Sequence, residues 1–226
     1  MIALSDEWKY KLSQISSSDR IVVIENYSLL HEDAVLEKVQ RKSNNTVLFL
    51  GEIGRRKGCY DIPEVIARVA KRIPDVKFIF AGSGSKADEN NIKLLLIKMN
   101  VAKNTQFSGW VRNKEKDLIL RQADVFFLPS YNEGMPMSIL EAMGYGLPVV
   151  STTVGGICKM VENKVNGYTL NPGDIQGMAE AITSILSNDE WRKALGKQSF
   201  CIVKNKYSLE VHLDKIRQQY ERELTK

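Results

Sequence analysis

Two carboxylates, Glu133 and Glu141, are separated by seven residues in the stretch YNEGMPMSILEAMGYGLPVV, which runs from Tyr131 to Val150. Pro136 suits the first turn of a helix, so this stretch predicts a Gly/Pro loop that leads into a helix. Backbone N–H groups at a helix start attract phosphate and other anions. The candidate N–H donors are those of Gly134, Met135, Met137 and Ser138. The stretch therefore predicts an anion site that also contains acids.

The two acids can face the same opening. Helical side chains lean toward the N-terminus, so Glu141, about one turn inside the helix, can point back over the opening that Glu133 borders. Ile139, Leu140 and Met143 are predicted on the buried face of this helix. Glu133 has a second interpretation, because a carboxylate before a helix can also cap its free N–H groups.

Basic residues follow another predicted strand, in the stretch GEIGRRKG from Gly51 to Gly58. Its glycines allow a ligand to approach the backbone closely, and Arg55, Arg56 and Lys57 stand just before a helix, where they could meet phosphate. A flexible turn with solvated basic side chains is an equally good interpretation. The stretch is not a Walker loop, because the ending G-K-[ST] is absent.

Two more loops follow predicted strands. FIFAGSGSKADE contains Gly82 and Gly84, and Ala87 occupies the third glycine position of a dinucleotide fingerprint. Because this loop follows the second strand of the domain and not the first, a tight turn is favoured over a dinucleotide loop. In FSGWVRNKE, Trp110 follows a glycine, where it could pack in the core or lie beside a nucleotide base.

Short apolar runs that end in Gly, Ser or Pro alternate with longer amphipathic stretches. Strands are predicted at Val47 to Gly51, Lys77 to Gly82, Thr105 to Ser108, Asp124 to Pro129, Leu147 to Ser151 and Gly167 to Leu170. Helices are predicted at Gly58 to Arg72, Asp88 to Met99, Lys114 to Gln122, Met137 to Gly144, Gly156 to Glu162 and Asp174 to Leu186. This alternation predicts a doubly wound α/β fold with a parallel, Rossmann-like sheet of about six strands, which binds ligands at the strands' carboxyl ends.

The ends of the chain differ from this pattern. MIALS resembles the end of a buried strand, a helix is expected at about residues 6 to 15, RIVVIEN reads as a short strand, and a polar, partly helical connection follows. Residues 1–45 are therefore predicted to be the remnant of a preceding domain and a linker, and residues 46–190 the Rossmann-like domain. Residues 191–226 are predicted as a helical tail, whose last helix is capped by Ser208.

Composition excludes several other classes of protein. The 226 residues are 43% hydrophobic, and 32 Lys+Arg against 27 Asp+Glu give a net charge of +5 that is spread along the chain, so nucleic-acid binding has little support. Three separated cysteines and two distant histidines favour neither a disulfide framework nor a metal site. No apolar run reaches about 20 residues and no signal peptide is seen, which favours a reducing, cytoplasmic setting.

The stretch EGMPMSILEAMGYGLPVVST resembles the Glu-seven-residues-Glu signature of retaining glycosyltransferases of the GT-B fold, family 4. Neighbouring stretches agree with this family in order and spacing: VLFLGEIGRRKG, VKFIFAGSGS, FSGWV, ADVFFLPS and VGGICKMVENKVNGYTLNPGD. The resemblance covers Val47 to Leu186. It implies the C-terminal, nucleotide-sugar-binding half of a GT-B fold, with most of an acceptor-binding domain outside these residues.

The resemblance implies a role for each loop. Glu133 would hold hydroxyl groups of the donor sugar and Glu141 the ribose, which suits carboxylates because they accept hydrogen bonds from vicinal hydroxyls and are repelled by phosphate. Lys57 would face the diphosphate and offset charge on the leaving group. The backbone N–H groups near Met135, Met137 and Ser138 would assist Lys57 in holding the diphosphate. The loop with Gly82 and Gly84 would lie beside the sugar-phosphate, and the loop with Trp110 and Val111 beside the base.

One position departs from the family pattern. Many members have Arg after the first glycine of the basic loop, where this chain has Glu52. That removes one expected phosphate contact, which Arg55 or Arg56 could replace; an acid at this position could equally weaken binding of the sugar donor. The resemblance also implies retention of anomeric configuration without a strongly placed nucleophile, so Glu133 would orient the sugar donor and stabilise charge. The resemblance implies no divalent metal, and no DxD-type metal motif stands at the end of a predicted strand. No cofactor is implied either, because the nucleotide-diphosphate sugar is the donor substrate.

Three functions are compared on these residues. The leading one is the donor-binding domain of a transferase in surface polysaccharide or lipopolysaccharide synthesis, with a carbohydrate or lipid-linked acceptor and peripheral association with the inner face of the membrane. The second is a noncatalytic module that kept the half-fold. The third, a glycosidase with Glu133 and Glu141 as acid and base, is disfavoured because hydrolases do not use a diphosphate site. The isolated chain is expected to transfer sugar poorly, because catalysis needs both substrates in one cleft.

Overall fold

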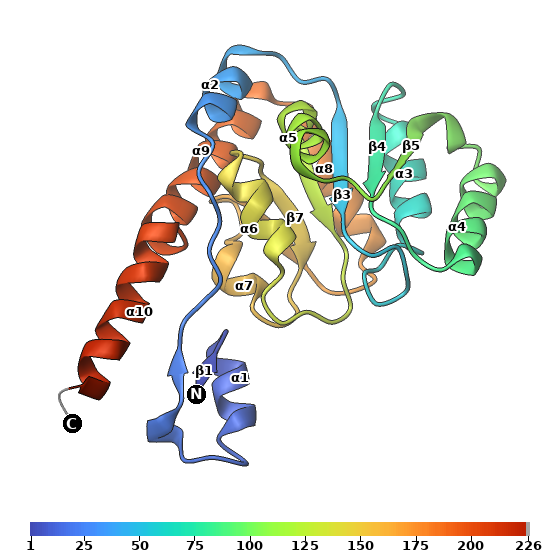
Figure 1. Ribbon diagram of the computed structural model, residues 1–226. Helices are drawn as coiled ribbons and strands as arrows, with labels where there is room; N and C mark the ends of the chain where they lie inside the picture. The colour runs from blue at the N-terminus through green and yellow to red at the C-terminus, as the bar shows by residue number, and fades with distance from the viewer. Residues whose placement is uncertain (225–226) are drawn as a thin grey trace.

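The computed structural model describes residues 1–224, and a fully parallel six-stranded sheet forms its centre (Figure 1). The strand order is β5-β4-β3-β6-β7-β8. The strands are β3 (Thr46–Leu50), β4 (Lys77–Ala81), β5 (Thr105–Gly109), β6 (Val125–Leu128), β7 (Val149–Thr152) and β8 (Gly167–Leu170). All six predicted strands are present, and the predicted doubly wound α/β fold is confirmed.

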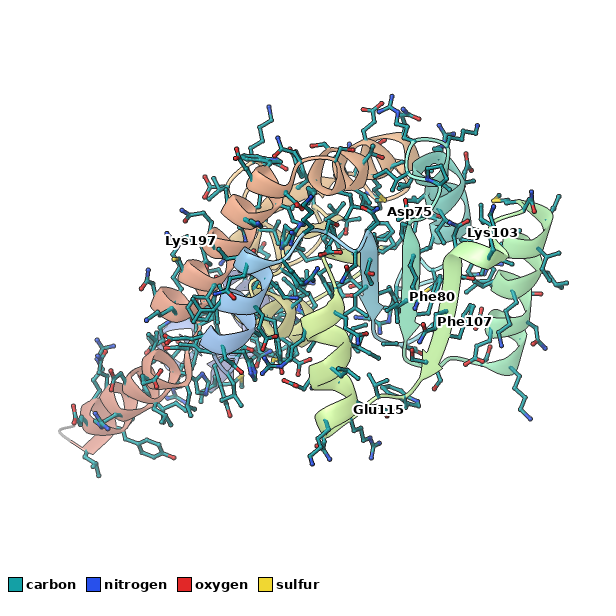
Figure 2. All side chains as sticks on the ribbon, turned by 90° about the horizontal axis from the view of Figure 1, so that it is seen from above. Asp75, Phe80, Lys103, Phe107, Glu115 and Lys197 are labelled. Carbon is teal, nitrogen blue, oxygen red and sulfur yellow. The ribbon has the colours of Figure 1, made fainter. Side chains whose placement is uncertain are left out.

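Apolar runs place the middle strands in the core. Every residue of β6 and β7 is buried, as are the first four residues of β3. Such strands need cover on both faces, because continuous Val, Leu and Phe side chains point to both sides of a sheet. The edge strand β5 is more open, and there Phe107 stacks on Phe80 of β4 with ring centroids 4.7 Å apart (Figure 2).

Helices cover both faces of the sheet. In Figure 1, α5 (Asn113–Gln122) and α6 (Met137–Gly144) lie in front of it, and α3 (Ile62–Ala70) and α8 (Ile175–Leu186) lie behind. The other elements of this region are α4 (Lys86–Lys98), α7 (Ile157–Met160) and the short 3-10 helix η2 (Ala102–Asn104). The buried face predicted for α6 is confirmed, since Ile139, Leu140 and Met143 are all buried.

Three predicted helices are shorter than expected, and one of them, expected at about residues 6 to 15, spans only Asp6–Leu12. The prediction began the first helix of the sheet domain at Gly58, but α3 begins at Ile62, because Gly58 has a left-handed φ of 71° and Pro63 marks the true first turn. The helix predicted to reach Glu162 ends at Met160. There the Glu162 N–H donates to the side chain of Asn166, at 2.8 Å, instead of continuing the helix.

The strand order contains one topological switch point. The chain moves from β3 to β4 toward one edge of the sheet and from β6 to β7 toward the other, and β3 and β6 are neighbours. Connections that diverge from two adjacent strands leave a crevice outside their carboxyl ends. The loops after β3 and β6 are the two that carry Lys57 and Glu133.

The N-terminal elements lie away from the six-stranded sheet, next to α10 in Figure 1. They are β1 (Ile2–Ala3), α1 (Asp6–Leu12), the 3-10 helix η1 (Ser18–Arg20) and β2 (Val22–Val23), with β1 and β2 paired in parallel. The C-terminal helices are α9 (Asp189–Lys206) and α10 (Leu209–Leu224). Ser208 accepts a hydrogen bond from the N–H of Val211 at 3.4 Å, in agreement with its predicted capping role.

A buried lysine joins the segment predicted as a linker to the sheet domain. Lys38 lies on α2 (Glu32–Gln40), and its Nζ donates to the carbonyl oxygens of Leu120, Arg121 and Ala123 at 2.8, 2.6 and 2.7 Å. These carbonyls end α5, so Lys38 supplies donors to a helix C-terminus that lacks its own. Burial lowers the pKa of Lys38 to about 7.

Of residues 1–224, no helix combines the length and the apolar character that crossing a membrane requires.

Candidate active site

An ion pair at the switch point joins the loops that follow β3 and β6. The Nζ of Lys57 lies 2.6 Å from Oε1 of Glu133, and the side chains are only 13% and 5% exposed. The same carboxylate oxygen accepts a hydrogen bond from the hydroxyl of Ser130 at 2.6 Å. The fold therefore brings together two of the predicted residues at the place where doubly wound sheets bind ligands.

Glycines allow the loops around this pair to touch. A Cβ on Gly58, next to Lys57, would lie 1.9 Å from the carbonyl oxygen of Pro129. Gly155, after β7, has a φ of 56°, and a Cβ there would lie 1.9 Å from the carbonyl oxygen of Glu133. Both contacts are shorter than any side chain allows, so the loops can meet only because these two residues are glycines.

The second predicted carboxylate forms a different ion pair. Glu141, on α6, lies 2.8 Å from the Nζ of Lys116 on α5, and both side chains are partly exposed. Lys116 was not among the predicted site residues. Nothing in its local sequence marks it, because the contact depends on how α5 and α6 lie over the sheet. Each acid of the signature thus has its own lysine.

A cavity of about 390 Å³ lies beside these two ion pairs; Lys57, Lys116 and Glu141 line it, whereas Glu133 does not. Seven of the predicted residues line it: Arg56, Lys57, Trp110, Val111, Met137, Ser138 and Glu141. Trp110 is 64% exposed whereas Val111 is buried, so the alternative of Trp110 as a core residue is wrong. Its indole is available as a wall of the cavity.

The start of α6 presents free N–H groups to this cavity. Met137 is the first helical residue, as the predicted range has it. Pro136 is the N-cap, just before the first turn in which it was expected. The N–H groups of Met137 and Ser138 have no hydrogen-bond partner within the described part of the chain, as expected for a first helical turn. These two groups and the ammonium of Lys57 give the cavity positive character.

Gly134 and Met135 hold the loop before α6 instead of lining the cavity. The carbonyl oxygen of Gly134 accepts from the N–H of Gly156 at 2.7 Å, and that of Met135 accepts from the side chain of Asn26 at 3.4 Å. Met135 is buried. These two residues fix the path of the chain between Glu133 and the helix.

The glycines after β4 serve backbone packing. A Cβ on Gly82 would lie 1.9 Å from the carbonyl oxygen of Gly51, and one on Gly84 would lie 1.9 Å from that of Ile53. Neither glycine lines the cavity. The structure thus agrees with a tight turn, in which the loop after β4 packs against the loop after β3 and supports it.

The basic loop divides its arginines between two places. Arg56 lines the cavity, where its guanidinium lies 3.0 Å from Glu52 in an exposed ion pair. Arg55 instead stacks on the ring of Tyr60, 4.4 Å from its centroid, and borders a separate hollow, which Arg56 also borders. Glu52 therefore has a positive neighbour, and Arg56 is the one of the two arginines that lines the cavity.

The sheet order, the cavity at the switch point and the paired charges define a Rossmann-like α/β domain with a polar ligand cavity. The chain belongs to the family of glycosyl transferases group 1, whose model matches residues 33–200. The match covers most of the chain and includes every element that lines the cavity.

Similar proteins agree with this assignment. The chain is 31% identical over 160 residues to 2-deoxystreptamine N-acetyl-D-glucosaminyltransferase of Niallia circulans, which covers 70% of this chain and 40% of the relative. It is 29% identical to UDP-Gal:alpha-D-GlcNAc-diphosphoundecaprenol alpha-1,3-galactosyltransferase of Escherichia coli, over 81% of this chain and 48% of that one. The chain thus spans about half the length of these relatives or less.

Solved structures show the same fold. TarM of S. aureus, solved with UDP, has a TM-score of 0.83 at 23% identity, over 96% of this chain and 43% of that one. HepE of Anabaena, solved with UDP, has a TM-score of 0.84 at 19% identity, over 98% of this chain and 63% of that one. The sheet is the C-terminal half of a GT-B fold, as the sequence predicted.

Proposed function

We propose that this chain is the donor-binding half of a retaining, nucleotide-sugar-dependent glycosyltransferase that acts in surface polysaccharide or glycoconjugate synthesis. One observation carries the proposal. At the switch point, Lys57 and the free N–H groups of Met137 and Ser138 border a cavity that Glu141 also lines. The carboxylate of Glu133 contacts Lys57 at 2.6 Å but does not itself line the cavity.

This arrangement suits a ligand with two chemical parts. The ammonium and the N–H groups favour phosphate, whereas the carboxylates accept hydrogen bonds from hydroxyl groups. A nucleotide-diphosphate sugar has a diphosphate with a ribose on one side and a sugar on the other. Glu141 would bind the ribose, beside Trp110 and Val111 near the base, and Glu133 would bind the sugar.

The chemistry assigned to these residues is electrostatic. As the bond between the sugar and the diphosphate breaks, negative charge grows on the leaving phosphate, and Lys57 with the N–H groups of α6 would stabilise it. Glu133 would orient the sugar and stabilise the positive charge that develops on it. Arg56 would add a further positive charge at the edge of the cavity.

The nucleotide is proposed to be UDP. TarM and HepE, which share the fold, were both solved with UDP. The acceptor would bind outside residues 1–224, in the other half of the full-length enzyme, and a lipid-linked acceptor would bring that enzyme to the inner face of the membrane.

Calorimetric titration with UDP, GDP and ADP tests the proposal. We expect UDP to bind, and Glu141→Ala to weaken it about 10-fold to 100-fold, as the loss of a hydrogen bond to a charged group does. Glu64→Ala is the matched control, because Glu64 also pairs with a basic residue, Arg68, but on the exposed face of α3. The proposal would be abandoned if none of the three nucleotides bound, or if Glu64→Ala weakened UDP as much as Glu141→Ala.

A further inference from the structure

A buried serine contacts the carboxylate of Glu133. Ser130, the second residue after β6, is fully buried, and its hydroxyl donates to Oε1 of Glu133 at 2.6 Å. Lys57 contacts the same oxygen atom at 2.6 Å. Two donors on one oxygen fix the plane of a carboxylate, whereas one donor leaves it free to turn about its last torsion angle.

The other oxygen of Glu133, Oε2, has no hydrogen-bond partner among residues 1–224, although the side chain is only 5% exposed. Oε2 is nevertheless not among the fully buried polar atoms that lack a partner, so it retains access to solvent, and a hydroxyl group of a ligand can reach it. Because Ser130 and Lys57 both hold Oε1, Oε2 is the atom left to accept hydrogen bonds from a bound molecule.

Ser130 is itself held from the neighbouring strand. Thr152, the last residue of β7, is buried and donates from Oγ1 to the carbonyl oxygen of Ser130 at 2.6 Å. The position of the serine hydroxyl therefore depends on the rigid sheet and not on the mobile end of a long side chain. Lys57, by contrast, has three N–H donors and a flexible stem, so it can contact Glu133 and a phosphate together.

We propose that Ser130 is a positioning residue that orients Glu133 so that Oε2 faces the sugar of the bound nucleotide sugar. This inference rests on the proposed function and adds a residue to it. Ser130 does not contact the diphosphate in this assignment, so it distinguishes a sugar-bearing ligand from the bare nucleotide.

The test compares UDP with UDP-glucose by calorimetry in the 226-residue chain. Ser130→Ala should leave the affinity for UDP within about twofold of the wild type, and should weaken UDP-glucose about tenfold, the effect of one hydrogen bond to a charged group. In a Glu133→Gln background, the same substitution should add no further loss for UDP-glucose, because its effect passes through Glu133.

Ser151→Ala is the matched control. Ser151 is also a fully buried serine at the carboxyl end of a strand, but its hydroxyl donates to the carbonyl oxygen of Leu128, at 2.7 Å, and not to Glu133. Its loss should cost stability without changing the ratio of the UDP and UDP-glucose affinities. If Ser130→Ala does not fold, Ser130→Cys takes its place, because cysteine has a similar shape but is a weaker donor. It should weaken UDP-glucose relative to UDP, by less than the tenfold expected for Ser130→Ala.

The outcomes separate this inference from the proposed function. No binding of UDP by the wild type would overturn both. Wild-type binding of UDP, combined with an unchanged ratio in Ser130→Ala, would overturn only the role of Ser130. The role of Ser130 would also be overturned if Ser130→Ala weakened UDP and UDP-glucose equally, or if Ser151→Ala changed the ratio of the two affinities as much as Ser130→Ala does. The same holds if Glu133→Gln left the affinity for UDP-glucose unaltered.

Discussion

The ammonium of Lys57 lies 2.6 Å from a carboxylate oxygen of Glu133, although 76 positions separate the two residues in the chain. The pair connects the loop after β3 with the loop after β6, on the two sides of the topological switch point. Each charge is almost fully buried, so each depends on the other for compensation. In the proposed function, the acid therefore does not oppose phosphate binding at the helix start, because it holds the lysine that would face the phosphate.

Removal of this lysine should destabilise the protein and abolish nucleotide binding. Lys57→Met leaves a buried carboxylate without its countercharge, and we expect a loss of about 3 kcal/mol in the free energy of unfolding, measured by urea titration. The double variant Lys57→Met/Glu133→Gln should recover most of that loss, because it also removes the negative charge, but should still not bind UDP.

Lys204→Met provides a control for this experiment. Lys204 pairs with Glu32 at 3.2 Å, with both side chains more than half exposed, so its loss should cost less than about 1 kcal/mol. A double variant as unstable as Lys57→Met alone would show that the buried charge of Glu133 is not the cause.

The contact between the two loops should depend on one glycine. Gly58→Ala forces a side chain into a left-handed backbone with a φ of 71° and against the carbonyl of Pro129, which should cost about 1–3 kcal/mol and weaken UDP binding by separating the loops. Gly54, in the same loop, has no atom within 4 Å of an added Cβ. Gly54→Ala should therefore change neither property much, and similar effects of the two variants would contradict this explanation.

The buried lysine of α2 should stabilise α5. Lys38→Met removes a donor from three carbonyl groups at the end of α5. Arg41 also donates to those of Arg121 and Ala123, so the buried carbonyl of Leu120 is the one that loses its side-chain donor, and we expect a loss of about 2 kcal/mol in the free energy of unfolding. Lys98, in the last turn of α4, is exposed, and Lys98→Met should change the stability by less than about 0.5 kcal/mol. Equal losses in Lys38→Met and Lys98→Met would mean that the buried contacts of Lys38 contribute nothing to the free energy of unfolding.

His31 should make stability depend on pH. Its ring stacks on Tyr145 with centroids 3.8 Å apart, and burial lowers its pKa below the usual value of 6.5. As the pH falls through 6.5, the unfolded chain therefore takes up the proton more readily than the folded protein, so this contribution to stability falls with pH. Urea midpoints at about pH 7.5 and 5.5 should differ more in the wild type than in His31→Phe, which keeps the stacked ring. If the urea midpoints at the two pH values differed more in His31→Phe than in the wild type, the predicted direction of the pH dependence would be wrong.

The strands and the helix start could be predicted from the sequence because their signals are local. Continuous apolar runs such as VLFL and VFFL require burial on both faces, and alternation with helices makes the sheet parallel. The stretch before α6 marks a helix start by its glycine and proline. These features depend on neighbours in the chain, so a single sequence is sufficient to find them.

Only the tertiary structure decided which charges meet. The pairs of Lys57 with Glu133 and of Lys116 with Glu141 depend on strand order and on how α5 lies beside α6, as does the contact of Ser130 with Glu133. The same packing turned Arg55 away from the cavity while Arg56 lines it. Local patterns cannot specify the contacts of Glu133 and Glu141, because the sheet brings their partners close through its loops and helices. For Arg55 and Arg56, which are adjacent in the chain, the direction in which the loop turns decides which side chain lines the cavity.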